Sequence, residues 1–190
     1  MGEAKIRREE LRAHMIVELE RLMAPATPEE DALNDEIRAL EFYEIHRVPD
    51  GQLSYMRMET QRCHQNAGAY ARLDPSGDSR HVSGWWKRAG IFYFHSVVLS
   101  QTKLHCVTPH RDRLPLTFAP DFDIVWSEVD GFMKSARRGA DVPFLVRDFP
   151  DKVIAEANEA RGALQAGADP RTIKMQLSAY SAEGGRQWRR

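Results

Sequence analysis

The stretch RCHQNAGAY, residues 62–70, decides how the fold of this chain is read. Cys63 and His64 stand directly before small residues, and CHQNAGAYARL predicts a helix of about three turns that starts at or just before Cys63. The unpaired N–H groups and the dipole at a helix start favour a thiolate. Cys63 therefore has the position of a nucleophile, although a lone cysteine is also a common small core residue.

Composition and charge narrow the classes of function. The chain has 190 residues, of which 42% are hydrophobic, enough for one core with accessory helices. Because 27 Lys and Arg residues balance 28 Asp and Glu residues, no overall charge attracts nucleic acid or anionic lipid. No apolar stretch approaches the roughly 20 residues that span a bilayer, and the charged start does not suit a signal peptide. We expect a cytoplasmic protein with no nucleic-acid or membrane partner.

Helical patterns precede the Cys63 region. Apolar residues recur at helical spacing over residues 3–23, and Pro25 ends this predicted helix. A second predicted helix follows, with Thr27 as its N-cap and Glu30 as the capping-box partner. These helices form an expected N-terminal extension over residues 1–45.

Two further helices are predicted after the core, which we place at residues 46–150. The first has an apolar stripe between Val153 and Leu164, and Asp169 caps the second. Residues 151–182 are expected to hold both helices, and residues 183–190 form a loose basic tail. The apolar stripe of the last helix consists of Ile173, Leu177 and Tyr180.

Strand patterns follow the loop DPSGDS, residues 74–79. HVSGWW (81–86), IFYFHSVVL (91–99) and KLHCVT (103–108) are aromatic and β-branched, and the short SQT connection predicts an antiparallel hairpin between the last two. Residues 109–125 are expected to be mostly irregular, and residues 123–139 to begin extended and end as a helix.

His95 interrupts an apolar row in the centre of a predicted strand. Alternation places it on one face with Ile91, Tyr93, Val97 and Leu99. A buried ring needs a partner, which is either a backbone carbonyl or tyrosine in an ordinary core, or a thiol that the ring activates. With QT as the turn, Ser100 pairs with Lys103 and His95 lies opposite Thr108, whose hydroxyl is then a candidate acceptor for the ring.

The order of these motifs resembles a known superfamily. A cysteine at a helix start, a tryptophan strand, FHSVV and a return strand ending in VTP resemble the core of papain-like and transglutaminase-like cysteine hydrolases. The pattern also resembles uncharacterised bacterial proteins with CHxN, GW, FHSVW and DVTP motifs. The resemblance covers residues 60–109 and implies Cys63 as nucleophile and His95 as general base. The position before VTP, where that superfamily has an Asp or Asn that orients the ring, is Cys106 here.

The remaining members of such a site stay open. Asp121 and Asp123 are later candidates for the third residue. The backbone N–H of Cys63 is a natural oxyanion donor, with Gln61 or Asn66 as a side-chain donor, although Asn66 also suits a first-turn cap. Trp85 is a candidate wall of a substrate groove, although alternation favours one of the two adjacent tryptophans in the core and one at the surface.

Two alternatives belong to other classes. A zinc site needs four ligands, and the chain offers suitable cysteines and histidines, but their spacing does not match local zinc motifs, so we expect no metal and no cofactor. The candidate ligands are Cys63, His64, His95, His105, Cys106 and His110. A non-catalytic interaction module would use the terminal helices and leave an apolar patch exposed on one of them.

We therefore predict an α+β fold with a papain-like core. Its antiparallel sheet packs on the Cys63 helix, and helices are added at both ends. The predicted function is thiol-dependent acyl chemistry, namely amide hydrolysis, deamidation or acyl transfer, on a protein or peptide amide, by Cys63 and His95 with Thr108 as third residue. The substrate, the acceptor and the oligomeric state do not follow from the sequence.

Overall fold

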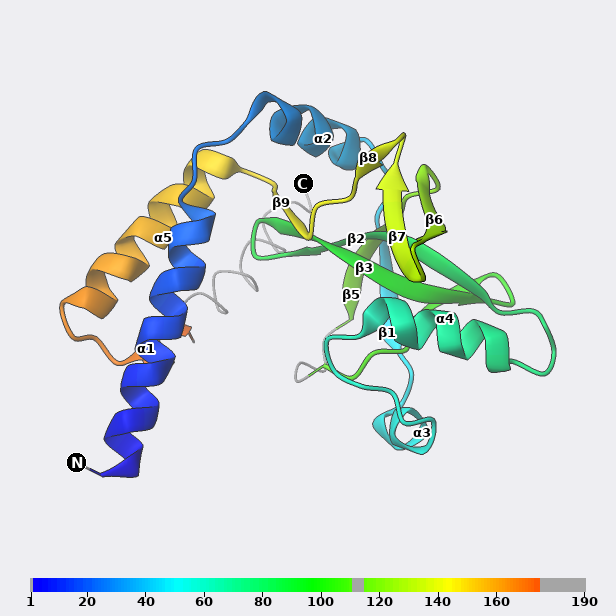
Figure 1. Cartoon of the computed structure of the whole chain (residues 1–190), viewed down its shortest axis with the longest axis horizontal. Coiled ribbons are helices and arrows are strands. Elements are labelled where there is room, and N and C mark those ends of the chain that lie inside the picture. Colours follow the sequence, from blue (N-terminus) through cyan, green and yellow to red (C-terminus); the bar gives the residue numbers. More distant parts are fainter. Residues whose placement is uncertain (1, 111–114, 175–190) are drawn as a thin grey trace. The chain divides into compact units, whose positions relative to one another are not determined.

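The computed structural model describes residues 2–110 and 115–174 of the chain (Figure 1). Contacts divide the described residues into two units, one formed by residues 2–34, 88–91 and 147–174, and the other by residues 35–87, 92–110 and 115–146. The fold is a mixture of helices and strands, as predicted, with helices near both ends of the chain. Within the described ranges, no helix combines the length and apolar character needed to cross a membrane.

The first unit is built on two helices, α1 (Glu3–Leu22) and α5 (Pro150–Gln165). Both follow from the sequence pattern, because the apolar stripe of each helix is the part that is buried. Leu19 of α1 packs with Ala157 and Leu164 of α5, and Ile173 completes this cluster. Asp169 caps the helical segment that begins at Pro170, as predicted, since its side chain accepts a hydrogen bond from the backbone N–H of Arg171. Leu177, Tyr180 and the predicted tail lie outside the described residues.

The start of α2 (Pro28–Arg38) has one predicted and one unexpected contact. The Thr27 hydroxyl accepts from the backbone N–H of Glu30 at 3.2 Å, so the predicted N-cap is confirmed. The Glu30 carboxylate, expected to complete a capping box, instead binds the buried guanidinium of Arg147. Arg147 also donates to the carbonyls of Leu22 and Ala24, which ties the chain between α1 and α2 to β9 (Leu145–Arg147).

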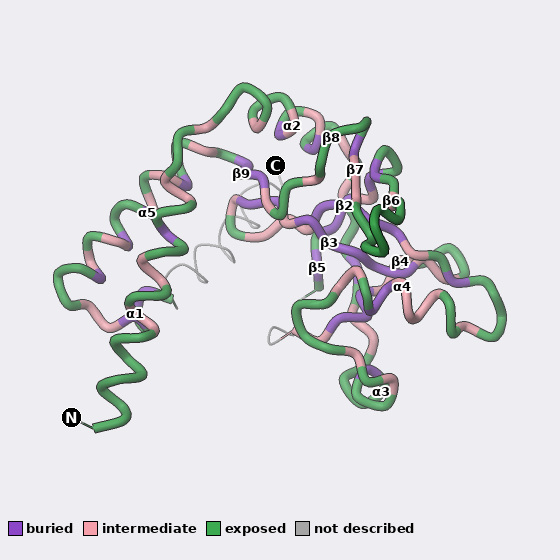
Figure 2. The backbone as a smooth tube through the Cα atoms, viewed as in Figure 1, coloured by how far each residue is buried: buried purple, intermediate pink, exposed green. Residues whose placement is uncertain are grey.

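The second unit is organised around a sheet in which five strands, β1 to β5, pair in a closed ring. Its strands are ordered β2-β5-β1-β4-β3-β9, and β2 also pairs with β3. The sheet is mixed, rather than antiparallel throughout as predicted, because β1 runs parallel to β4. The strands are β1 (Tyr43–Arg47), β2 (Arg80–Arg88), β3 (Ile91–Ser100), β4 (Lys103–Cys106) and β5 (Leu116–Pro120). Figure 2 shows that they carry most of the buried residues of this unit.

The hairpin of β3 and β4 has the predicted register. Ser100 pairs with Lys103 and Val98 with His105. The turn residues Gln101 and Thr102 both have positive φ angles, as the two-residue hairpin turn requires. One consequence is that His95 and Val97 face the interior of the ring of strands, where Val97 packs with Cys106 and Phe118.

Two predicted segments are wrong. Residues 116–120, expected to be irregular, form β5, which pairs with both β1 and β2. Residues 123–139 form a hairpin of β6 (Ile124–Val129) and β7 (Phe132–Arg137), not a strand followed by a helix. The turn explains the hairpin, because Asp130 and Gly131 both have positive φ angles, the Asp-Gly signature of a tight β-turn. β8 (Ala140–Asp141) completes this small sheet.

Close contact between β2 and β5 requires a glycine. A Cβ atom on Gly84 would lie 2.0 Å from the carbonyl oxygen of Ala119, a distance that no side chain tolerates. Next to it, Trp85 is fully buried as alternation predicts for one of the two tryptophans, whereas Trp86, expected at the surface, is half-buried and packs against the core.

The helix α4 (Cys63–Leu73) packs against the outside of β3 and β4. Ala67 contacts Val98 and Val107, and Leu53 of the short helix α3 (Asp50–Tyr55) completes this cluster. The prediction that the sheet packs on the Cys63 helix is confirmed. The expected boundary between residues 45 and 46 falls inside β1, which is an integral strand of the sheet.

Candidate functional site

Cys63 is the first residue of α4, as predicted. Its thiol is half-buried, and burial raises its pKa. Three backbone N–H groups oppose this increase in pKa, those of Ser96, His64 and Cys63 itself. Burial has the larger effect, so the sulfur rests as a neutral thiol instead of the thiolate expected from a helix start.

The contact between Cys63 and Ser96 places the sulfur at an edge of β3. Just before Ser96, Phe94 donates its backbone N–H to the carbonyl of Phe144. Just after it, Val98 pairs with His105 of β4. Alternate N–H groups of a strand point to the same edge, so the N–H of Ser96 lies between these two pairings and faces Cys63. Cys63 therefore lies beside the backbone that carries His95.

His95 is buried, and a neighbouring strand holds its ring. Its Nε2 lies 3.4 Å from Cys106 Sγ, and the ring packs near Trp86 and Phe118. Burial lowers the pKa of His95 to about 3, with smaller contributions from His110 and His64. The ring is neutral at physiological pH and does not supply the imidazolium that was expected beside Cys63. Within the described part of the chain, no hydrogen bond joins the ring to Cys63.

The contacts of Cys106 favour one tautomer of His95. Burial raises the pKa of Cys106 to about 11, so this residue is a neutral thiol. Its Sγ lies 3.7 Å from the carbonyl oxygen of Thr108, which accepts the S–H. The sulfur is then an acceptor toward the ring, and the Nε2–H of His95 donates to it. Nδ1 is left as the basic nitrogen.

Thr108 and Asn66 have other contacts than those predicted. The Thr108 hydroxyl accepts from Asn66 Nδ2 at 3.2 Å, and the expected hydrogen bond to the His95 ring does not form between these described residues. The same Asn66 amide donates to the backbone carbonyl of Glu59 and accepts from the Glu59 backbone N–H. These two hydrogen bonds hold the segment before α4 in place. Asn66 therefore neither caps the first turn of α4 nor has its amide available as an oxyanion donor; it holds the segment before α4 instead.

Three further candidates are also placed by the structure. Trp85 cannot wall a groove, because it is fully buried and donates to the Asp121 carboxylate. Asp121 also accepts from Arg137, and Asp123 pairs with Arg137 and Arg138, so neither carboxylate orients His95. Gln61 is exposed just before α4 and has a φ of 62°, in the left-handed region.

A hydrogen-bonded network under α4 was missed by the sequence analysis. The buried Ser96 hydroxyl lies 2.7 Å from His64 Nδ1, 2.8 Å from His81 Nε2 and 3.1 Å from the Ser83 hydroxyl. Trp126 of β6 donates to Ser83. The sequence signal was alternation, because His81 and Ser83 lie two apart on β2 and Ser96 faces away from His95. The network anchors the first turn of α4 to the sheet.

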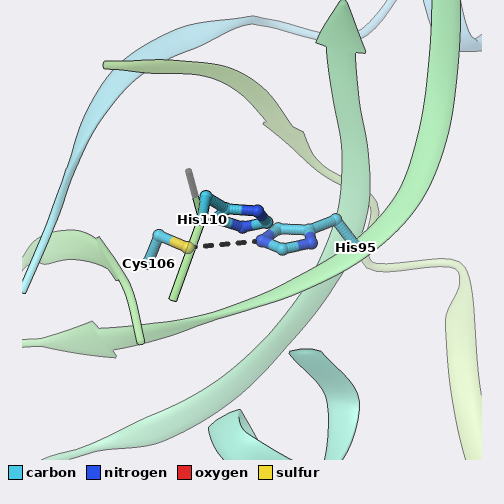
Figure 3. A group of neighbouring side chains, drawn as sticks. All are labelled: His95, Cys106 and His110. Carbon is cyan, nitrogen blue, oxygen red and sulfur yellow. Dashed lines mark hydrogen bonds between the residues drawn. The ribbon is translucent and has the colours of Figure 1, made fainter. Parts of the chain in front are cut away.

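A second group gathers where β3 meets the end of β4. One potential metal-ligand atom from each of His95, Cys106 and His110 lies within 4.8 Å of the others. Figure 3 shows these three side chains gathered together. His105 is not part of this group, since adjacent residues on a strand point to opposite faces. Sequence spacing argued against a metal here because these ligands come from separate segments of the chain.

Among residues 2–110 and 115–174, the most exposed large apolar side chains are not on the terminal helices. An interaction module was expected to leave an apolar patch on such a helix, but on α1 only Ile6 and Val17 are prominently exposed, at 41% and 47%. The large apolar residues exposed by more than 70% are Tyr55, Leu73, Phe122, Phe132 and Phe144.

Comparison of the chain with protein-family models, with curated proteins and with solved structures returned no match.

Proposed function

We propose that the second unit is a papain-like core that performs thiol-dependent acyl chemistry, with Cys63 as nucleophile and His95 as general base. One observation carries the proposal: the Cys63 thiol faces the backbone N–H of Ser96, the residue directly after His95 on β3. The helix start that holds the thiol and the strand that holds the ring are thus neighbours, while the His95 ring lies on the interior face of β3 and α4 packs against the opposite face.

The tautomer of His95 supports the proposed role. With Nε2–H bound to Cys106, Nδ1 accepts the thiol proton as the sulfur of Cys63 attacks a carbonyl carbon. The negative charge then develops on the carbonyl oxygen, where the backbone N–H of Cys63 and the exposed Gln61 amide are the candidate donors. The proton passes from Nδ1 to the leaving amine, and water or an acceptor amine later cleaves the thioester.

The structure also supports slow chemistry. A carboxylate beside His95 would stabilise the imidazolium that forms during attack, but Cys106 is a neutral thiol. Burial lowers the pKa of His95 to about 3, so protonation of the ring costs free energy. We expect a weaker base than in cysteine hydrolases with an Asp or Asn at this position.

An activated ester tests the proposal without knowledge of the substrate. On incubation with p-nitrophenyl acetate, Cys63 should become acetylated as p-nitrophenolate leaves, and peptide mass spectrometry locates the acetyl group. Cys63→Ser should abolish acetylation, and His95→Ala or His95→Gln should slow it at least tenfold. His105→Ala is the matched control, because this residue is outside the group around His95. Acetylation of Cys63 at an unchanged rate in both folded His95 variants would contradict the proposal.

A further inference from the structure

The His95–Cys106–His110 group has the dimensions of a metal site. Its ligand atoms all lie within 4.8 Å of one another, and His95 Nε2 is 3.4 Å from Cys106 Sγ (Figure 3). Zn–N and Zn–S bonds of ordinary length at a tetrahedral angle place nitrogen and sulfur about 3.6 Å apart. The pair of ligands from β3 and β4 is therefore already at the separation that zinc requires, and the ligand nitrogen of His110 lies within 4.8 Å of both.

The surroundings favour a bound cation with soft ligands. Two imidazoles and one thiolate form a donor set that selects zinc over magnesium or calcium. The Trp86 ring packs against both imidazoles, with centroids 4.9 Å from His110 and 5.6 Å from His95. The guanidinium of Arg47 donates to the His110 carbonyl. These contacts orient the ligands from outside, as in established metal sites.

We infer that His95, Cys106 and His110 bind zinc and that the bound ion switches off the chemistry of Cys63. Three protein ligands leave a tetrahedral ion one further position, which distinguishes this site from closed structural zinc sites. The inhibitory part of the inference rests on the proposed function, because it requires His95 to be the base.

The proton balance explains the inhibition. Zinc binding releases the thiol proton of Cys106 to solvent, and Sγ becomes a thiolate ligand. The metal takes the electron pair of His95 Nε2, so the proton of the neutral ring resides on Nδ1. Nδ1 is then a donor and has no electron pair with which to accept the proton of Cys63. No oxidant or further reactant is needed.

Cobalt tests the site independently of any activity. Chelator-treated protein titrated with Co²⁺ should give a thiolate-to-cobalt charge-transfer band and intense tetrahedral d–d bands at one equivalent, and Zn²⁺ should displace both. Cys106→Ser should remove the charge-transfer band, and His110→Ala should weaken Zn²⁺ binding at least tenfold. Cys63→Ser and His105→Ala should bind as the native chain does. Absence of stoichiometric binding, or loss of the charge-transfer band in Cys63→Ser with retention in Cys106→Ser, would overturn the site.

The inhibitory part has its own readout. With one equivalent of Zn²⁺, the exchange of the Cys63 thiol with 4,4′-dithiodipyridine should slow at least tenfold in the native chain. In His110→Ala, the same zinc concentration should leave the exchange rate of Cys63 unchanged. A cobalt spectrum of the expected form together with an unchanged Cys63 rate would overturn the inhibition and leave the site standing. If replacement of His95 leaves the exchange rate of the Cys63 thiol unchanged in the metal-free protein, the proposed function fails. The cobalt titration still shows whether the zinc site exists.

Discussion

Replacement of Cys106 by Asp should increase the reactivity of Cys63. The side chain at this position accepts the Nε2–H of His95, and a carboxylate would accept it far more strongly once the ring is protonated. The net free energy of a hydrogen bond to a charged group is about 1.5–3 kcal/mol. At about 1.4 kcal/mol per factor of ten, the population of the Cys63 thiolate–imidazolium pair should rise about 10- to 150-fold.

The rate of thiol exchange at Cys63 should rise less than the population of the thiolate–imidazolium pair. A thiolate with a lower pKa is a weaker nucleophile, with a Brønsted coefficient of about 0.4–0.5, so roughly half of the gain on a logarithmic scale is lost. We expect exchange of Cys63 with 4,4′-dithiodipyridine to be about 3- to 12-fold faster in Cys106→Asp than in Cys106→Ala at neutral pH. Both variants contain Cys63 as the single thiol, because the chain has only two cysteines.

Two controls make the result decisive. Cys106→Asn has nearly the shape of Asp without its charge and should stay near the rate of Cys106→Ala. His95→Ala in the Cys106→Asp background should remove the gain, because there is then no ring for the carboxylate to stabilise. If folded Cys106→Asp reacts no faster than Cys106→Ala, His95 does not act on Cys63 and the reasoning is refuted.

Three predictions concern stability, each measured by urea denaturation. Gly84→Ala should lower the free energy of unfolding by about 3 kcal/mol, because its Cβ would lie 2.0 Å from the Ala119 carbonyl oxygen; a loss below about 1 kcal/mol would contradict the packing. Arg147→Ala should cost about 3–5 kcal/mol by leaving the Glu30 carboxylate without its buried partner, whereas an exposed pair would cost under about 1 kcal/mol. Burial lowers the pKa of His64 from 6.5 to about 4, so the unfolded chain binds the extra proton between these pH values and stability falls as pH falls through them. His64→Gln should reduce this slope by about 1.4 kcal/mol per pH unit, and an unchanged slope would refute the assignment.

The sequence alone determined the features that depend on neighbouring residues. The helix start at Cys63, the N-cap at Thr27 and the hairpin that pairs Ser100 with Lys103 were all predicted, and each depends on residues within a few positions. Helical spacing also identified the buried stripe of α5. Such features are local because caps, turns and amphipathic spacing involve only adjacent turns of the chain.

Tertiary structure decided which strands pair and which side chains meet. The segment of β5 has prolines at its borders and too few residues for a clear pattern, and it is a strand because β1 and β2 both pair with it. The Asp-Gly turn between β6 and β7 was a local signal that the sequence analysis did not use.

The environment of His95 shows the same limit. Its strand and face followed from alternation, but its partners Cys106 and His110 come from later segments, and its burial exists only once the ring of strands closes. Desolvation depends on the whole fold and here lowers the pKa of His95 to about 3, while the sequence suggested an imidazolium. Local rules therefore identified the reactive residues, and long-range packing decided their protonation and their neighbours.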